Sequence, residues 1–201
     1  PRYNTDVANI LFNDWIIDQA DPDYIVVAPS YFILPLDFRP ILKQHIAKKS
    51  PVTVVYQKVT NAKDEFIGRG VYEFNSNGHV SNFTRNKGEE NKRNISLEIF
   101  IFNVKTFKFL LNEAQKISSF YTISDIVAYK ALNGLIVDGY EYEGYMRCVD
   151  SYQHYYDYSF ELLNYKVRRQ LFLAHWPIYT VTHDTPPAKY EKTARVNNAF
   201  I

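Results

Sequence analysis

The sequence predicts an α/β domain built around a mixed, mostly parallel β-sheet. Apolar residues at helical spacing alternate along the chain with short runs rich in β-branched residues, which is typical of such domains. The clearest unit is a strand at Tyr24–Ala28, a helix at Phe38–Lys48 and a strand at Pro51–Tyr56. This order favours parallel strands. A hydrophobic content of 46% in 201 residues is enough for a sizeable core.

The same two patterns predict the remaining elements. Apolar positions at helical spacing indicate one amphipathic helix near the start, over Asp6–Asp18. After the second strand we expect, in order, a hairpin of Gly70–Phe74 and His79–Thr84, a polar loop Arg85–Arg93, a strand Ile95–Val104, helices Lys105–Ile117 and Ser124–Leu132, one or two strands within Ile136–Val149, and a helix Ser151–Leu163. The pair Asn77-Gly78 is a strong hairpin signal. Thr122 or Ser124 is the expected N-cap of the helix that follows.

Three prolines, Pro177, Pro186 and Pro187, indicate a linker near the C-terminus. We therefore expect residues 1–176 to form the α/β domain and residues 177–201 to form a linker and the start of a second domain. Because the first residue is Pro1 and not Met, we also expect the chain to be an internal piece that lacks the N-terminal part of its domain.

Charge and cysteine content argue against several classes of protein. The 23 basic and 22 acidic residues give a net charge of +1, so the sequence has no electrostatic footprint for nucleic acid or an acidic membrane. No apolar run approaches the roughly 20 residues needed to span a bilayer. The single cysteine, Cys148, excludes an intrachain disulfide and favours a reducing compartment, so we expect a cytoplasmic protein.

Acidic side chains are missing directly after the strands where a metal site is expected. Nucleotidyl transfer uses Mg²⁺ held by carboxylates near the carboxyl ends of sheet strands. The strand ending at Val27 is followed by Ala28, Pro29, Ser30 and Tyr31. Farther along, Asp37 directly precedes a predicted helix, so it fits the start of that helix better than a metal ligand. Asp150 also precedes a predicted helix, so a role in capping it fits better than a role as a ligand.

Other chemical motifs are weak. No Gly-rich phosphate loop is present, and the five histidines show no metal-ligand spacing. The basic residues of the loop 85–93 could bind a phosphate, but two glutamates lie among them, which favours a solvated loop. Cys148 fits inert core packing better than a reactive thiol.

Several segments match, in the same order, the motifs of a known family. They are Tyr24–Ile33 with Leu36–Phe38, similar to V-V-L-A-G-D-H-I-Y…D-Y; Ser96–Phe102, similar to S-M-G-I-Y-V-F; Ser124–Val127, similar to K-D-I-I; Gly144–Tyr152, similar to G-Y-W-R-D-V…D-S-Y; and the proline-containing segment 177–190. In combination they resemble the bacterial glucose-1-phosphate adenylyltransferase family over nearly the whole chain. The resemblance implies a sheet of the nucleotide-diphospho-sugar transferase (Rossmann-like) type, with a left-handed β-helix beginning in residues 177–201. It places the family's G-G-x-G-T-R-L loop before Pro1.

The chain departs from this family at its functional positions. The resemblance places Tyr31 and Cys148 where the two metal-binding aspartates belong. Neither side chain replaces a carboxylate on Mg²⁺, because a hard cation prefers anionic oxygen. At the sugar-phosphate positions the family's Glu-Lys pair becomes Thr84 and Arg85. The resemblance also implies that Ser96 and Glu98 lie on the strand beside the sugar, with Glu98 where the family has glycine.

These departures resemble the GlgD-type subunit of the family, which implies a non-catalytic regulatory chain in glycogen synthesis. Such a chain binds no metal itself, and Mg²⁺ is expected in a catalytic adenylyltransferase partner within a hetero-oligomer of tetramer type. A sugar phosphate or phosphate effector remains a possible ligand of Arg85. Two alternatives stay open: an active nucleotidyltransferase that recruits Asp37 and Asp150, and a stand-alone sugar-phosphate-binding assembly module.

Overall fold

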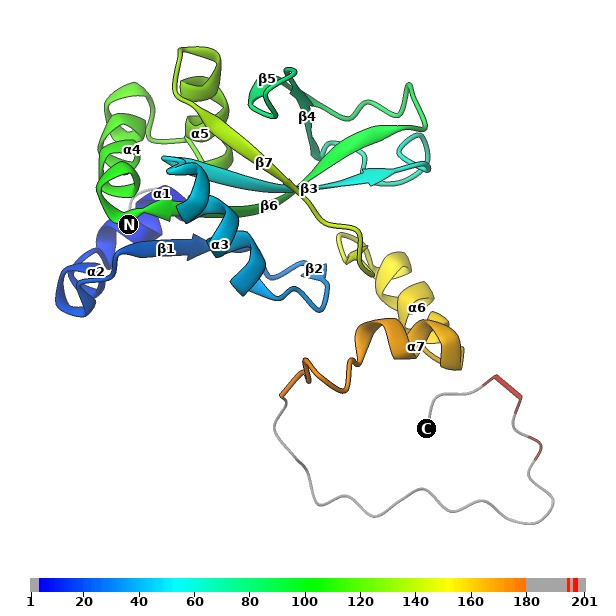
Figure 1. Ribbon diagram of the computed structural model, residues 1–201. Coiled ribbons are helices and arrows are strands. Elements are labelled where there is room, and N and C mark those ends of the chain that lie inside the picture. The colour runs from blue at the N-terminus through cyan, green and yellow to red at the C-terminus, as the bar shows by residue number, and fades with distance from the viewer. Residues whose placement is uncertain (1–3, 180–194, 196, 199–201) are drawn as a thin grey trace. The chain divides into compact units, whose positions relative to one another are not determined.

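The computed structural model describes residues 4–179, 195, 197 and 198 (Figure 1), and the chain divides into two compact units. Residues up to Pro29 and the range Phe38–Glu143 form the first unit. The range Ser30–Asp37 and the residues from Gly144 onward form the second. This division does not test the domain boundary predicted at residue 177, which stays a prediction.

The first unit is an α/β structure. Its helices are α1 (Asp6–Phe12), α2 (Trp15–Ala20), α3 (Phe38–Lys48), α4 (Val104–Ile117) and α5 (Ile123–Leu132), and its strands are β1 (Tyr24–Val27), β3 (Val52–Val59), β4 (Gly70–Phe74), β5 (Val80–Arg85), β6 (Arg93–Asn103) and β7 (Val137–Glu141). The strands form one sheet in the order β5-β4-β6-β3-β7, and β1 also pairs with β6. The predicted α/β class with a mixed sheet is therefore confirmed.

Strand β6 is the centre of this sheet. Strand β3 pairs with β6 along one edge, from Val52 opposite Phe102 to Val59 opposite Arg93. On the other edge, β1 pairs with the second half of β6 and β4 meets it at Ile95. All three partners run antiparallel to β6, so β1, β3 and β4 point the same way.

The prediction of a mostly parallel sheet is wrong for the described strands, where β3 with β7 is the one parallel pair. The strand–helix–strand unit does give β1 and β3 the same direction. However, β6 lies between them and runs the opposite way. Sequence patterns predict the relative direction of elements that are neighbours in the chain. They do not predict that a strand from later in the chain will lie between them.

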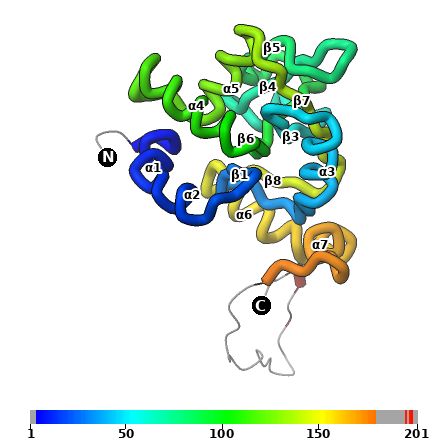
Figure 2. Tube along the Cα trace, turned by 60° about the vertical axis from the view of Figure 1, so that its left-hand side comes forward, coloured from blue at the N-terminus to red at the C-terminus, as the bar shows by residue number. Residues whose placement is uncertain are grey.

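Both faces of β3 are covered by helices. Val52 and Val54 lie in the core that includes α4 and α5. On the opposite face, Thr53 Oγ1 lies 2.8 Å from His45 Nδ1 of α3. Because successive strand residues point to opposite faces, α3 lies on one side of the sheet and α4 with α5 on the other (Figure 1, Figure 2).

Aromatic and branched apolar side chains form the core of the first unit. Fully buried members include Tyr72, Phe100, Phe102, Phe107, Leu110, Leu111, Ile123 and Ile126. Each such side chain contributes about 1.5–3 kcal/mol relative to an exposed one. The long apolar strand β6 and the apolar stripe of α4 supply much of this set, as the sequence predicts.

The prediction of a single helix over Asp6–Asp18 is wrong, because this segment forms two helices, α1 and α2. Thr5 caps α1 by accepting from the Ala8 amide at 3.2 Å. Asn13 ends it: its amide donates to Ile10 O, and its side chain donates to Asn9 O at 2.8 Å. An asparagine side chain that bonds to nearby backbone competes with helix continuation.

Helix α5 begins as predicted at a Thr122 cap. The Asp125 amide donates to Thr122 Oγ1 at 3.2 Å, and the Thr122 amide donates to Asp125 Oδ2 at 3.1 Å. This reciprocal pair is a capping box.

Asp138 ties the start of β7 to two neighbouring segments. Its buried carboxylate accepts hydrogen bonds from the Ser50 hydroxyl and from Lys48 Nζ, the latter at 3.1 Å. His79, in the turn between β4 and β5, places Nδ1 3.1 Å from the same carboxylate. Burial opposes ionisation, but the hydrogen bonds from Ser50 and Lys48 and the nearby positive charge outweigh it and lower the pKa of Asp138.

The second unit contains the short strands β2 (Phe32–Ile33) and β8 (Arg147–Cys148) and the helices α6 (Tyr152–Glu161) and α7 (Tyr165–Leu171). Ser151 caps α6 by accepting from the His154 amide at 3.0 Å. The predicted helix Ser151–Leu163 corresponds to α6. Most of residues 177–201, including the segment expected to begin a β-helix, lies outside the described residues.

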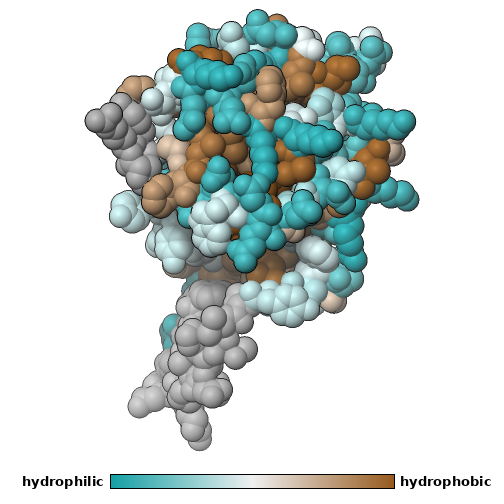
Figure 3. All heavy atoms as spheres, turned by 90° about the vertical axis from the view of Figure 1, so that its left-hand side faces the viewer, coloured by the Kyte–Doolittle hydropathy of each residue, from teal (hydrophilic) through white to brown (hydrophobic). Residues whose placement is uncertain are grey.

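No helix in the described part of the chain is long and apolar enough to cross a membrane. Apolar side chains do reach the surface, among them Phe12 and Trp15 on α1 and α2. Figure 3 shows apolar side chains in separate areas between hydrophilic ones on the face turned toward the viewer. Scattered exposure of this kind is normal for a protein surface.

Candidate functional site

Tyr31 and Cys148, the two residues at the expected metal positions, lie on neighbouring segments of the second unit. Phe32 of β2 is the register partner of Cys148 on β8. One residue before it, the Tyr31 carbonyl oxygen accepts from the Val149 amide at 2.8 Å. The short β2–β8 ladder therefore brings both positions together, although they are 117 positions apart in sequence.

The surroundings of Cys148 do not fit a Mg²⁺ site. Its buried thiol lies 3.6 Å from Asp150 Oδ2. The other oxygen of Asp150 lies 2.6 Å from His154 Nδ1. A thiol, a phenol and one carboxylate already engaged by a histidine are a poor oxygen donor set for this cation. Among the residues that the structure describes, no group of three or more His, Cys, Asp or Glu side chains could hold a metal ion.

Arg147, next to Cys148, is held rigidly inside the second unit. Its Nε donates to Glu161 Oε2 at 2.7 Å, and its Nη2 donates to the other oxygen of the same carboxylate. The guanidinium also lies over the rings of Tyr145 and Tyr158, 4.8 and 5.5 Å from their centroids. A bidentate pair stacked on aromatic rings is a strong arginine arrangement, and it fixes β8 against α6.

The sugar-phosphate positions lie in the first unit, around an irregularity in β6. The register of β3 with β6 shifts between Val55, opposite Ile99, and Tyr56, opposite Ser96. Leu97 and Glu98 lie between these two register pairs. Glu98 takes a left-handed conformation with φ of 52°. Such a bulge redirects the strand, and glycine adopts its backbone conformation most easily.

Hydrogen bonds inside this bulge involve Ser96. Its hydroxyl accepts from the Glu98 amide at 3.1 Å, and Ser96 is fully buried. The buried hydroxyl of Tyr72 also lies near Ser96 and makes no hydrogen bond of normal geometry with the described residues. Burial raises the pKa of Tyr72 well above its ordinary value, so its phenol stays protonated and offers a donor there.

Two arginines near the bulge already have acidic partners. Arg85 Nη2 lies 3.1 Å from Asp125 Oδ1, and Arg85 Nη1 donates to the Gly68 carbonyl oxygen at 3.4 Å. Arg69 Nη1 lies 4.0 Å from Glu98 Oε1. We call Asp6, Arg69, Arg85, Glu98 and Asp125 the arginine–carboxylate cluster.

Asp6 joins this cluster through the N-terminus of α5. Its two carboxylate oxygens each accept from the Ile123 amide at 3.1 Å. Burial raises the pKa of Asp6, while hydrogen bonds from the amides of Ile123 and Val7 lower it; the negative charges of Asp125 and Glu98 raise it further. Two guanidinium groups thus lie beside Asp125 and Glu98, and Asp6 adds a third carboxylate close to them.

The comparisons decide the family of the chain. A model of the nucleotidyl transferase family matches residues 3–143. The chain belongs to this family. The match ends at Glu143, which is also the last residue of the first unit.

Several curated relatives share the greater part of the chain. It is 25% identical to a glucose-1-phosphate adenylyltransferase of Pseudothermotoga lettingae over 187 residues, which cover 92% of this chain and 44% of the relative. It is 28% identical to the glycogen biosynthesis protein GlgD of Bacillus subtilis over 184 residues, 91% of this chain and 43% of that protein. A Bacillus subtilis glucose-1-phosphate adenylyltransferase is 25% identical over 201 residues, 99% of this chain and 52% of the relative. The chain thus spans about half the length of the relatives it matches, and the resemblance drawn from the sequence motifs is confirmed.

Sequence reasoning identified only part of the cluster. It singled out Arg85, Ser96 and Glu98, and their role in binding a sugar phosphate stays a prediction. It gave no role to Asp6, Arg69 or Asp125. The Thr122-x-x-Asp125 spacing of a capping box was a usable signal for Asp125, whereas the proximity of Asp6 depends on tertiary packing alone.

Proposed function

We propose that this chain is part of a glucose-1-phosphate adenylyltransferase of glycogen synthesis and acts there as a non-catalytic, GlgD-type subunit. The observation that carries this proposal is the pairing of β2 with β8, which brings together Tyr31 and Cys148 at the two expected metal positions. Neither side chain supplies an anionic oxygen at neutral pH, so these two positions offer no ligand for the Mg²⁺ of nucleotidyl transfer.

The proposal includes a catalytic partner. A subunit without metal ligands contributes to the reaction only by binding to a chain that has them, in a hetero-oligomer of tetramer type in the cytoplasm. The 28% identity to the protein named GlgD supports this reading. The arginine–carboxylate cluster and the adjoining Ser96 are the proposed contact for a sugar phosphate, with Arg85, Ser96 and Glu98 as the binding residues.

Two measurements test the proposal. The complete protein is assayed alone with Mg²⁺, ATP and glucose 1-phosphate, and then together with a catalytic adenylyltransferase chain. We expect no ADP-glucose from the protein alone, and a stable mixed oligomer with altered turnover or altered effector response. Turnover of the isolated protein at the partner's level, abolished by EDTA, would overturn the non-catalytic assignment.

An active-site role for Asp37 and Asp150 makes a different prediction. If these carboxylates hold the metal, the double variant Asp37→Asn, Asp150→Asn loses activity while the fold is retained. The exposed Asp64→Asn variant, which has the same change of charge per site, is the control. Absence of a mixed oligomer would instead favour a stand-alone sugar-phosphate-binding module.

A further inference from the structure

The sheet of the first unit opens between β4 and β6. These strands share one register pair, Val71 with Ile95. Beyond that pair a side chain bridges them, because Asn94 Nδ2 donates to the Tyr72 carbonyl oxygen at 3.0 Å. On the other edge of β6, the β3 ladder continues to Val59. The opening is therefore framed by three hydrogen-bonded strands.

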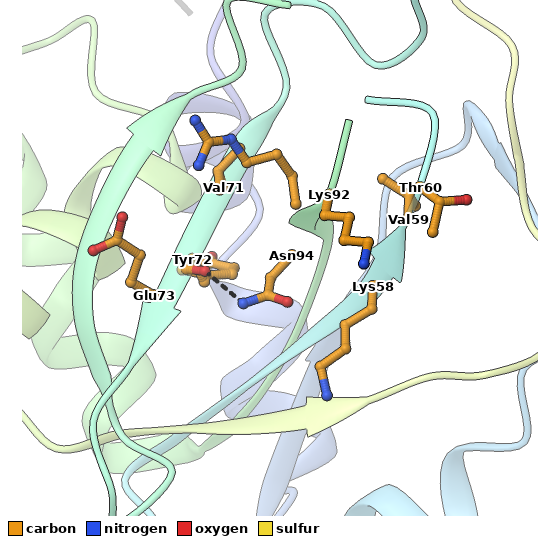
Figure 4. A pocket seen from close by; sticks show the side chains of 9 residues that line it. Lys58, Val59, Thr60, Val71, Tyr72, Glu73, Lys92 and Asn94 are labelled. Carbon is orange, nitrogen blue, oxygen red and sulfur yellow. Dashed lines mark hydrogen bonds between the residues drawn. The ribbon is translucent and has the colours of Figure 1, made fainter. Parts of the chain in front are cut away.

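A cavity of about 310 Å³ occupies this opening (Figure 4). We call it the β4–β6 notch. Its lining contains three cations, Lys58, Lys92 and Arg93, and one acid, Glu73. The buried side chains of Val59 and Val71 give it an apolar component. The volume is at the lower end of the range for small-molecule sites.

The basic groups of the notch are available to an incoming anion. Lys92 has no ion-pair partner among the described residues, and Figure 4 shows its ammonium group directed toward the end of β3 at Val59. Lys58 Nζ lies 2.6 Å from Glu141 Oε2, and Arg93 Nη1 lies 2.9 Å from Glu90 Oε2. The Lys58 and Glu90 side chains are 63% and 61% exposed. Solvent screens such pairs, so a ligand competes with them readily.

The acid of the notch is engaged elsewhere. The Glu73 carboxylate accepts from Asn82 Nδ2 of β5 at 3.2 Å. Its charge remains, but three cations against one acid leave the lining with a net positive charge. Thr60 and Asn94 add neutral hydrogen-bonding groups beside them.

We propose that the β4–β6 notch binds a small organic phosphate, with Lys92 as its main contact and Lys58 and Arg93 as secondary contacts. Several cationic donors around one opening match the several oxygens of a phosphate group. The apolar part of the lining favours an organic phosphate over inorganic phosphate. This inference goes beyond the proposed function, since none of these residues belongs to the β2–β8 ladder or to the arginine–carboxylate cluster.

Titration calorimetry with two probes, phenyl phosphate and inorganic phosphate, tests the inference on the complete protein. We expect saturable binding of both, tighter for phenyl phosphate and weakened by added salt. Lys92→Glu lowers the affinity about tenfold or more. The matched control is Lys105→Glu, another exposed lysine of the first unit that lines no part of the notch, and it changes the affinity by less than about twofold. Both positions are exposed, and circular dichroism verifies the fold of each variant.

The outcomes separate this site from the cluster. No saturable binding of either probe up to about 10 mM, or equal losses in the two lysine variants, would overturn the inference. An Arg85→Gln variant adds a third arm. Binding that is lost in Arg85→Gln and kept in Lys92→Glu would place the anion at the arginine–carboxylate cluster and also refute the notch. Turnover in the adenylyltransferase assay enters none of these readouts, so the two proposals fail separately.

Discussion

The Arg85 guanidinium lies 3.1 Å from the Asp125 carboxylate, so the basic side chain assigned to a sugar phosphate already has an anionic partner. Asp125 also belongs to the capping box of α5. The charge of the proposed binding site is thus coupled to the start of a helix.

Asp125→Asn is expected to strengthen binding of glucose 1-phosphate. The change frees Arg85 from its ion pair, while the amide oxygen of asparagine still accepts from the Thr122 backbone. Because both partners are partly exposed, we expect a gain in affinity of about threefold to tenfold and a stability loss below about 1 kcal/mol. Titration calorimetry measures the affinity, with Asp64→Asn as control. Unchanged or weaker binding would show that Arg85 does not contact the ligand.

Glu98→Gly is expected to stabilise the first unit. Glu98 has a φ of 52°, and a non-glycine residue in that region costs about 1 kcal/mol or more. Glycine removes this strain but loses more chain entropy on folding, so a net gain of about 0.5–1 kcal/mol is expected. Urea unfolding measures it. Glu98→Val, with a β-branched side chain, should lower stability in the same assay. If Glu98→Gly lowered stability as well, the backbone at this position would not be strained.

Arg147→Lys is expected to loosen the second unit. Lysine keeps the charge but cannot form the two parallel hydrogen bonds to Glu161 or stack on Tyr145 and Tyr158. We expect a local destabilisation of about 1–2 kcal/mol. Hydrogen exchange reports it as faster exchange of the α6 amides with unchanged exchange in α4. Arg168→Lys on α7, where no carboxylate pair holds the guanidinium among the described residues, serves as control. Equal effects of the two substitutions would refute the role of the bidentate pair.

Asp138→Asn is expected to destabilise the protein at neutral pH and to do so less in acid. The pKa of Asp138 is lower in the folded than in the unfolded chain, so the contribution of its charge is complete above the unfolded value of about 3.9. It is lost as the pH falls through the folded value. We expect a difference between wild type and variant of about 2 kcal/mol at pH 7 that shrinks below a pH of about 4.

Urea unfolding of both proteins at each pH measures this difference, so the titration of other groups largely cancels. His45, on the same side of the sheet, is an exception: burial lowers its pKa and the charge of Asp138 raises it, so its titration differs between the two proteins. A difference that stays constant down to pH 3 would exclude the charge of Asp138 as its source.

The sequence patterns predicted elements better than their pairing. Strand β6 and helix α4 were predictable from their apolar residues, because most of the strand and one stripe of the helix are buried. The position of β6 between β1 and β3 follows only from long-range pairing. Asn13 ends α1 through its own side chain, a local competition that apolar periodicity does not register.

Residues of the candidate site could be predicted where the resemblance to the family's motifs covers them. Tyr31 and Cys148 stand in segments that resemble family motifs, and the same resemblance places Arg85 at a sugar-phosphate position, so these positions could be assigned from sequence. The left-handed backbone at Glu98 could not, since a glutamate gives no signal for it. Nor could the meeting of Asp6 with the α5 terminus, which joins residues more than a hundred positions apart.

The central place of β6 also bears on how the chain folds. Tyr24 pairs with Asn103 and Val52 with Phe102, so each contact closes a loop of about 80 or 50 residues before any stabilisation is gained. Chains dominated by such distant pairings fold slowly. Until β6 has been synthesised and docked, β1, β3 and β4 expose unpaired edges. The nascent chain is therefore most prone to aggregation before residue 103 emerges, and a chaperone or partner that covers those edges would act in that interval.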